Sequence, residues 1–241
     1  MTSAVAELAP TGVLRAGINL GNFLLVTGRA PNGDPTGVAP DMAAAVAERL
    51  DVPVAYLPFA RPSALADAAD DGVWDIGLIG AEPARAEKIA FTAAYAEIEA
   101  AYLVQPNSAL TRLEDVDQPG VRIAVLARSA YDLWLERNIK RATLIRSDAA
   151  DGATKMFTDG AADVLAGLRP GLVDEAVRHP GARILDGKFT AVQQAIGTQR
   201  RNPAGAAFLA AFVEEAKASG LIARLIERHG MTGRLQVAPP A

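Results

Sequence analysis

Short apolar runs and helix-like segments alternate along the first eighty residues. Residues 13–19 and 52–57 are apolar runs bounded by turn residues, which is typical of β-strands. Residues 42–50 and 63–69 are expected to be helices. Residues 74–79 form a further, almost wholly apolar strand, as in a sheet buried on both faces. This alternation predicts an α/β fold in which helices cover both faces of a parallel sheet.

The same alternation begins again after a turn-rich segment at residues 105–108. An apolar strand at residues 100–104 leads into that segment, and a fresh strand at residues 121–125 follows it. The chain therefore contains a second α/β body. Its expected elements are strands at 143–146, 162–166, 183–185 and 190–197 and helices at 130–137, 152–158 and 171–178, before helices over 202–230 that break at Gly220.

We expect two lobes, with the last helices returning to the first one. The first lobe comprises residues 10–104 and 195–241, and the second comprises residues 108–190. The chain crosses between the lobes at 104–108 and again at 188–194. Residues 1–9 form an N-terminal tail.

Composition and charge narrow the functions that this fold could serve. The chain has 241 residues, of which 50% are hydrophobic and 22% charged, so an ordered protein with ample core is expected. The net charge of -4 provides no basic surface for a nucleic acid. Without cysteine, disulfides and thiolate metal sites are excluded. His179 and His229 stand beside Pro or Gly in loops, so we expect neither a metal site nor a cofactor.

No apolar run approaches the ~20 residues that a membrane-spanning helix needs. The first ten residues also lack the basic and apolar regions of a secretory signal. The sequence as written is thus expected to be cytoplasmic, or periplasmic if a leader has been removed.

The order of several short segments resembles a known family, the extracellular solute-binding proteins, family 3, of amino-acid ABC transporters. Each segment is weakly specific alone, but their order and spacing extend over nearly the whole chain. The segments are 14–18 (LRAGI), 37–43 (GVAPDMA), 72–76 (GVWDI) followed by Arg85, 91–95 (FTAAY) and 195–197 (AIG).

The resemblance implies the type II periplasmic binding fold: two Rossmann-like α/β lobes joined by a two-strand hinge that closes on a small ligand. It places Arg85 where the family keeps an arginine that clamps the ligand carboxylate, a task suited to the planar guanidinium. The alternative is a surface arginine paired with Glu82 or Glu87. Ser129 matches the family position at a helix N-terminus that donates to the same carboxylate, and it would also be a simple N-cap.

Two departures from the family pattern concern the ligand. The segment 75–85 is shorter than usual and lacks the threonine-rich stretch that commonly holds an amino acid. The acid that the family uses for an α-ammonium group is replaced by Leu168, with Arg169 beside it. An unpaired ammonium in a closed site is costly, so an amino acid would need another acid, such as Asp132, Glu97 or Glu99. Arg169 favours a second anionic group instead, although it could equally be a surface arginine at a helix start.

Further ligand contacts are expected from residues that follow the first strand or lie at the second crossing. Asn19, Asn22 and Phe23 follow the strand, and Tyr131 could form a wall of the site. Gln194 could reach the ligand through its amide or satisfy the hinge backbone. Phe59 is a further wall candidate, Phe23 and Phe59 could equally be core residues, and Trp74 and Trp134 are expected to be packing residues.

These observations predict a binding protein, not an enzyme, for a small carboxylate, amino acid or dicarboxylate. The expected partners are this ligand and an ABC permease; a cytoplasmic sensor or carrier would use the same chemistry. The protein is expected to be a monomer that neither binds nucleic acid nor inserts into a membrane. A lyase resembling cyclohexadienyl dehydratase is the enzymatic alternative, with Glu97 and Glu99 as candidate acids.

Overall fold

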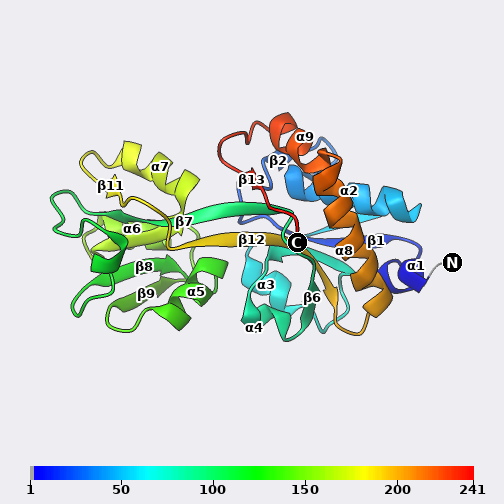
Figure 1. Cartoon of the computed structure of the whole chain (residues 1–241), viewed down its shortest axis with the longest axis horizontal. Helices are drawn as coiled ribbons and strands as arrows, with labels where there is room; N and C mark the ends of the chain where they lie inside the picture. Colours follow the sequence, from blue (N-terminus) through cyan, green and yellow to red (C-terminus); the bar gives the residue numbers. More distant parts are fainter. Residues whose placement is uncertain (1–2) are drawn as a thin grey trace. The chain divides into compact units, whose positions relative to one another are not determined.

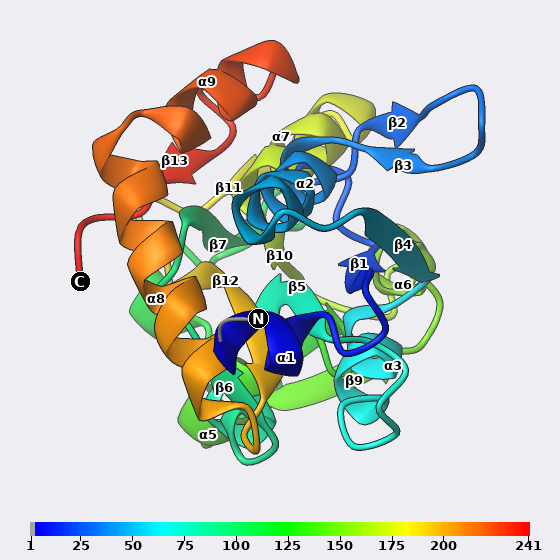
Figure 2. The same cartoon turned by 90° about the vertical axis from the view of Figure 1, so that its right-hand side faces the viewer.

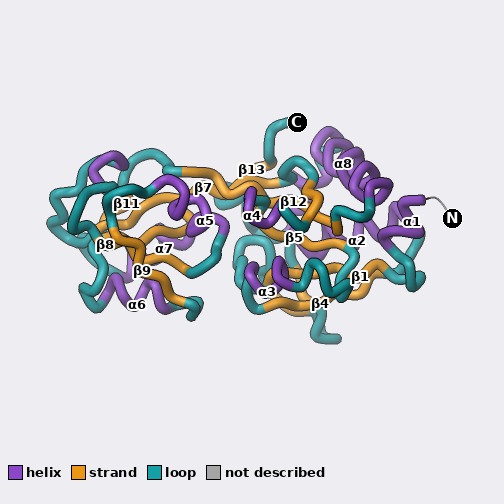
Figure 3. Tube along the Cα trace, turned by 90° about the horizontal axis from the view of Figure 1, so that it is seen from below, coloured by secondary structure: helices purple, strands orange, loops and turns teal. Residues whose placement is uncertain are grey.

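The chain divides into two units that are connected by two strands. The computed structural model describes residues 3–241. Unit 1 contains the residues up to Glu97 and Gln193–Ala241, and unit 2 is Ile98–Val192 (Figure 1). Strands β7 (Ala96–Val104) and β12 (Thr190–Gln199) each have residues in both units (Figure 3).

The units divide a few residues away from the predicted crossings. The first division lies between Glu97 and Ile98, before the predicted segment 104–108. The reason is that residues 100–104 of β7 pair with strands β10 and β11 of unit 2, so most of β7 belongs to unit 2. The second division, between Val192 and Gln193, lies within the predicted segment 188–194.

Unit 1 is built on a sheet with the strand order β4-β1-β5-β12. The parallel strands are β1 (Leu14–Asn19), β4 (Val54–Phe59) and β5 (Ile76–Gly80). Strand β12 runs antiparallel to β5 because it re-enters the unit from the opposite direction, and β6 (Ile89–Phe91) pairs with it. The predicted parallel sheet is therefore correct for three strands but not for β12.

Two helices cover opposite faces of this sheet, as Figure 2 shows: α2 (Val38–Leu50) and α3 (Pro62–Asp67). On the α3 face, Leu65 and Trp74 pack over two glycines, Gly17 and Gly77. A Cβ at Gly77 would lie only 2.8 Å from Leu65 Cδ2. Trp74 is fully buried and its indole N–H donates to Leu65 O at 3.1 Å, which confirms its predicted packing role.

The remaining elements of unit 1 are short, apart from the last helices. Helix α8 (Pro203–Ala218) ends before Gly220, whose φ of 71° supplies the left-handed turn into α9 (Leu221–Arg228), as predicted. The other elements are α1 (Ser3–Leu8), α4 (Pro83–Ala86), the hairpin β2 (Gly28–Arg29) and β3 (Pro35–Thr36), and β13 (Gln236–Val237), which pairs with the start of β7.

The prediction of an N-terminal tail over residues 1–9 differs from the structure. Of the described residues, Ser3–Leu8 form helix α1, which lies against α8 (Figure 2). Leu8 is fully buried, and the Glu7 carboxylate accepts a hydrogen bond from Gly205 N at 2.7 Å in the first turn of α8. A contact between residues 198 positions apart leaves no periodic signal in a six-residue helix, so it could not be read from the sequence.

Unit 2 has the strand order β7-β10-β8-β9. Strands β8 (Arg122–Leu126), β9 (Thr143–Ser147) and β10 (Val164–Leu168) are parallel, and β7 runs antiparallel to β10. Its helices are α5 (Ala130–Asn138), α6 (Gly152–Thr158) and α7 (Arg169–Arg178), with a 3-10 turn at Leu113–Asp115 and a short strand β11 (Arg183–Ile184) on β7.

The sheet of unit 2 has a hydrophobic cluster on each face. Tyr102 and Val104 of β7 point into one cluster and Ala101 and Leu103 into the other. This follows from the two-residue period of a strand, which sends successive side chains to opposite faces. Trp134 packs against the first cluster, where its ring lies 5.3 Å from Phe189, so its predicted packing role is also confirmed.

Both units use the same ionic device at the amino end of the parallel strands, which we call the Arg–Asp clamp. In unit 1, Asp75 accepts hydrogen bonds from Arg15 N, Nε and Nη2 at 2.9, 3.0 and 2.7 Å. In unit 2, Asp163 accepts the same three bonds from Arg122 at 2.8, 3.1 and 2.9 Å. In each case the aspartate N–H donates back to the arginine carbonyl. The clamp fastens β1 to the start of β5 in unit 1 and β8 to the start of β10 in unit 2.

Candidate functional site

In unit 1, four predicted site residues lie at the carboxyl end of β1 and β5. Asn19 is the last residue of β1, and Asn22 follows in the next turn. Arg85 belongs to α4, and its Nη1 donates to the carbonyl of Gly80, the last residue of β5, at 2.7 Å. Gln194 of β12 is the register partner of Gly80. The fold therefore brings these residues to one edge of the sheet, where ligands commonly bind in open α/β proteins.

Arg85 is buried rather than displayed on a solvated helix surface. Its relative exposure is 6%, which is rare for an arginine unless its charge is compensated. Helix α4 begins with Pro83, whose fixed φ favours the first helical position, and this start turns Arg85 back toward β5. A guanidinium at this position is suited to bind a carboxylate, because its planar fork matches the two carboxylate oxygens.

The two asparagines are fixed by their own backbone turns. The Asn19 side-chain oxygen accepts a hydrogen bond from Gly21 N at 3.1 Å, and the Asn22 side-chain oxygen accepts one from Leu24 N at 3.2 Å. The carboxamide nitrogens make no hydrogen bond within residues 3–241. Each asparagine therefore keeps donors that a ligand oxygen could accept from.

Phe23 lies next to these residues but is not part of the core. Its relative exposure is 45%, and the Arg234 guanidinium lies 5.7 Å from the ring centroid, within cation–π range. Phe59, by contrast, packs against the cluster that contains Leu65 and Trp74.

In unit 2, Ser129 and Tyr131 lie at the carboxyl end of β8 and the start of α5. Ser129 is the N-cap of α5, and its Oγ accepts a hydrogen bond from Asp132 N at 3.1 Å. The Ser129 hydroxyl is also hydrogen-bonded to Tyr131, while burial raises the pKa of the Tyr131 phenol to about 12. The phenol is therefore neutral at physiological pH and can donate or accept a hydrogen bond.

Arg169 is engaged by an acid of its own unit. Its Nε donates to Glu99 at 2.8 Å, its Nη2 donates to Gly187 O, and Lys188 lies 3.5 Å from the same glutamate. Glu99 therefore offsets only part of the positive charge of Arg169 and Lys188. That Arg169 binds a second anionic group stays a prediction.

An ion pair that the sequence interpretation did not assign lies beside Ser129, between a buried aspartate and an exposed arginine. Asp132 is 2% exposed, accepts Arg128 N at 2.7 Å, and pairs with Arg146 Nε at 2.9 Å. Burial is the main cause that raises the pKa of Asp132, against these hydrogen bonds. The spacing of Ser129 and Asp132, three residues apart, is a helix-capping pattern that could have identified the contact, but nothing in the sequence indicated Arg146.

Leu168, which replaces the family acid, lies among apolar groups. It packs with Tyr131 and Phe189 against a buried cluster of Ala100, Ala130 and Val192. The Phe189 ring stacks on Tyr102 at 4.4 Å. This part of unit 2 is therefore an apolar surface and offers no carboxylate at the position of Leu168.

The comparisons with known proteins agree with this fold. The sequence profile of the bacterial extracellular solute-binding proteins, family 3, matches residues 22–232. The chain therefore belongs to this family, and the predicted fold class, the type II periplasmic binding fold, is confirmed. No curated protein matches the sequence at a significant level.

Several solved structures are similar over nearly their whole length. One is an ancestral amino acid-binding protein described as a precursor of cyclohexadienyl dehydratase, with a TM-score of 0.75 and 21% identity over 94% of this chain and 99% of that one. A mutant of ArgBP from T. maritima has a TM-score of 0.75 and 20% identity, with the same shares covered. A protein from Wolinella succinogenes is described as a binding component of an ABC transporter in complex with lysine. It has a TM-score of 0.75 and 20% identity over 90% of this chain and 95% of that one.

Within residues 3–241, each helix is too short or too polar to cross a bilayer. The same residues contain no group of three or more His, Asp or Glu side chains arranged to hold a metal ion.

Proposed function

We propose that this protein binds a small carboxylate-bearing solute and that Arg85 holds the carboxylate. The observation that carries the proposal is the burial of Arg85 at the carboxyl end of β5, with its Nη1 fixed on Gly80 O. Asn19, Asn22 and Gln194 lie at the same edge of unit 1 and supply further polar groups. Within unit 2, Ser129 and Tyr131 stay predicted ligand contacts, as the family resemblance implies.

We further propose that the solute lacks an α-ammonium group and has an apolar body. An ammonium needs a free acid, and Leu168 is not one. Of the other candidate acids, Asp132 is committed to Arg146, and Glu99 is committed to Arg169 and Lys188. Glu97 makes no ion pair within residues 3–241, so it is the one candidate acid that an ammonium could still use. The apolar group of Tyr131, Leu168 and Phe189 instead favours a hydrocarbon part of the solute. This distinguishes the proposed ligand from the lysine and arginine named for structures of similar fold.

The family supports a role in transport, in which the protein delivers its solute to an ABC permease. The lyase alternative receives less support from the residues. A general acid must be free to exchange its proton near neutral pH, whereas Glu99 is neutralised by two cations. Only Glu97, which pairs through its backbone with Gln236 of β13, remains as a candidate.

Native mass spectrometry of the freshly purified protein, followed by calorimetry with the molecule it reveals, tests the proposal. We expect a bound monocarboxylate, and Arg85→Ala should weaken its binding at least ~100-fold, because loss of one partner of a buried charge pair costs ~3–5 kcal/mol. Arg49→Ala is the control, since Arg49 is an exposed arginine of unit 1 paired with Glu215. Tight binding of lysine or arginine that is unaffected by Arg85→Ala would refute the proposal, and conversion of the solute would favour the lyase.

A further inference from the structure

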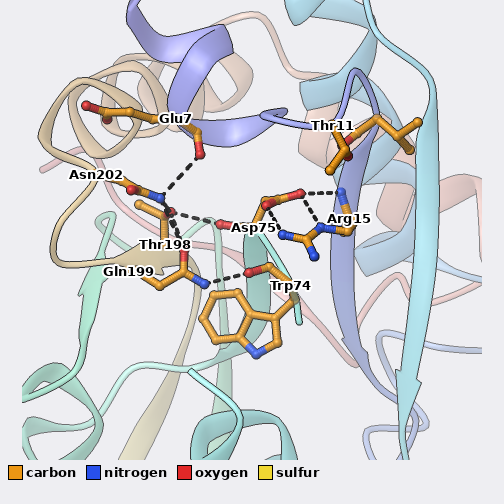
Figure 4. A network of polar contacts seen from close by, with 9 residues as sticks. Glu7, Thr11, Arg15, Trp74, Asp75, Thr198, Gln199 and Asn202 are labelled. Atoms are coloured by element: carbon orange, nitrogen blue, oxygen red, sulfur yellow. Dashed lines mark hydrogen bonds and ion pairs between the residues drawn. The ribbon is translucent and has the colours of Figure 1, made fainter. Parts of the chain in front are cut away.

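A pocket of about 270 Å³ lies within unit 1 at the amino end of its parallel strands. It is lined by α1, by the residues just before β5, and by the turn after β12, and its polar side chains include Glu7, Arg15, Asp75 and Arg201. Figure 4 shows most of its polar network. Arg15 and Asn19 stand at opposite ends of β1, four residues or roughly 13 Å apart, so this pocket is separate from the proposed carboxylate site.

Most polar groups of the pocket are already used by contacts within unit 1. Asp75 accepts three hydrogen bonds from Arg15, and the Glu7 carboxylate accepts the hydrogen bond of Gly205 N. Asn202 Nδ2 donates to Thr198 Oγ1 and to Gln199 Oε1, both at 3.1 Å (Figure 4). Gln199 Nε2 in turn donates to Trp74 O. These contacts give the pocket a fixed wall.

Arg201 differs from these polar groups, because its side chain is not used in a contact of this kind anywhere in residues 3–241. Within the part of the chain that the structure describes, its side chain makes no hydrogen bond or ion pair. Its guanidinium lies over the turn at Gly72, where a Cβ would be 3.6 Å from Nη2. Arg15 adds a second guanidinium, whose Nη1 makes no hydrogen bond among residues 3–241. The donors left over in the pocket therefore belong to two arginines.

We propose that this pocket is a second binding site, for a small molecule that carries an oxyanion, either a carboxylate or a phosphate. The charge of Asp75 is offset by Arg15, and that of Glu7 is offset in part by the first turn of α8. Arg201 is exposed and makes no ion pair within residues 3–241, so its guanidinium can pair with an anion at the mouth of the pocket. The volume is below the ~300–1,000 Å³ of drug-sized sites, which limits the ligand to a small metabolite.

The two tryptophans provide a direct reporter, because Trp74 lines the pocket and Trp134 belongs to unit 2. Backbone amide N–H signals of ¹⁵N-labelled protein are followed by NMR, because the backbone of Trp74, and not its buried indole, joins the pocket network. The protein is titrated with inorganic phosphate and, separately, with succinate, both at constant ionic strength. We expect a saturable shift of the Trp74 signal in at least one titration, with the Trp134 signal unchanged. The two titrations distinguish a phosphate from a carboxylate ligand.

Arg201→Ala should weaken the binding about tenfold or more, as expected for loss of a charged hydrogen bond. Arg200→Ala is the matched control: it removes the same charge one residue away, from a side chain outside the pocket lining, and should change the affinity less than twofold. Ala6→Glu places a carboxylate on the exposed lining of α1 and should abolish binding. A Trp74 signal that does not saturate with either probe, or equal effects of Arg201→Ala and Arg200→Ala, would overturn the proposal.

Discussion

The two Arg–Asp clamps have the same hydrogen bonds but different exposure, and so they predict unequal losses of stability. The side chain of Asp75 is 4% exposed and that of Arg15 30%, whereas Asp163 and Arg122 are 39% and 43% exposed. Removing one partner of a buried ion pair costs ~3–5 kcal/mol, but exposed pairs contribute only ~0–1 kcal/mol. Because Arg15 keeps partial access to water, we expect Asp75→Asn to lower the free energy of unfolding by about 3 kcal/mol and Asp163→Asn by about 1 kcal/mol or less.

Urea denaturation followed by tryptophan fluorescence measures both losses, since each unit contains one tryptophan. In a Trp134→Phe background the signal comes from Trp74 in unit 1, and in a Trp74→Phe background it comes from Trp134 in unit 2. Each aspartate variant is compared with its own background, so the cost of replacing the tryptophan cancels. Equal losses in the two units, or a larger loss for Asp163→Asn, would show that burial does not set the strength of the clamp.

Three further outcomes are expected. Gly77→Ala should destabilise unit 1 by ~1–3 kcal/mol, because its Cβ would lie 2.8 Å from Leu65 Cδ2; an unchanged urea midpoint would contradict this packing. The hydrogen bond from Arg122 lowers the pKa of Asp163, so the ionised Asp163 stabilises the fold above the unfolded pKa of ~3.9, and this stabilisation is lost as the pH falls below that value. Asp163→Asn should therefore flatten the acid side of the plot of unfolding free energy against pH. A plot for the variant that runs parallel to that of the original protein would count against this. Leu168→Glu should weaken binding of the carboxylate solute and strengthen binding of α-amino acids, measured by calorimetry; the opposite preference would disprove the ligand class.

The alternation of strands and helices could be predicted from the sequence, because each element is indicated by a few neighbouring residues. The apolar run that forms β5 and the turn at Gly220 are visible in a few neighbouring residues, and both have the predicted structure. The antiparallel direction of β12 is not local. It depends on the strand's return from unit 2, which no short window of sequence records.

The candidate site shows the same division between local and distant information. The N-cap at Ser129 follows from its position before a helix, and it is present. The pairing of Arg169 with Glu99 depends on two residues 70 positions apart that meet only when β10 pairs with β7 in a particular register. A one-residue change of register would turn Glu99 to the other face of the sheet, so its partner could not be inferred from residue types.

The central claim is that Arg85 binds the carboxylate of the solute, and a crystal structure of the complex tests it most directly. We predict a carboxylate oxygen within hydrogen-bonding distance of the Arg85 guanidinium, with Nη1 still bound to Gly80 O. A solute whose carboxylate is held elsewhere, with Arg85 bound only to protein groups, would contradict the account.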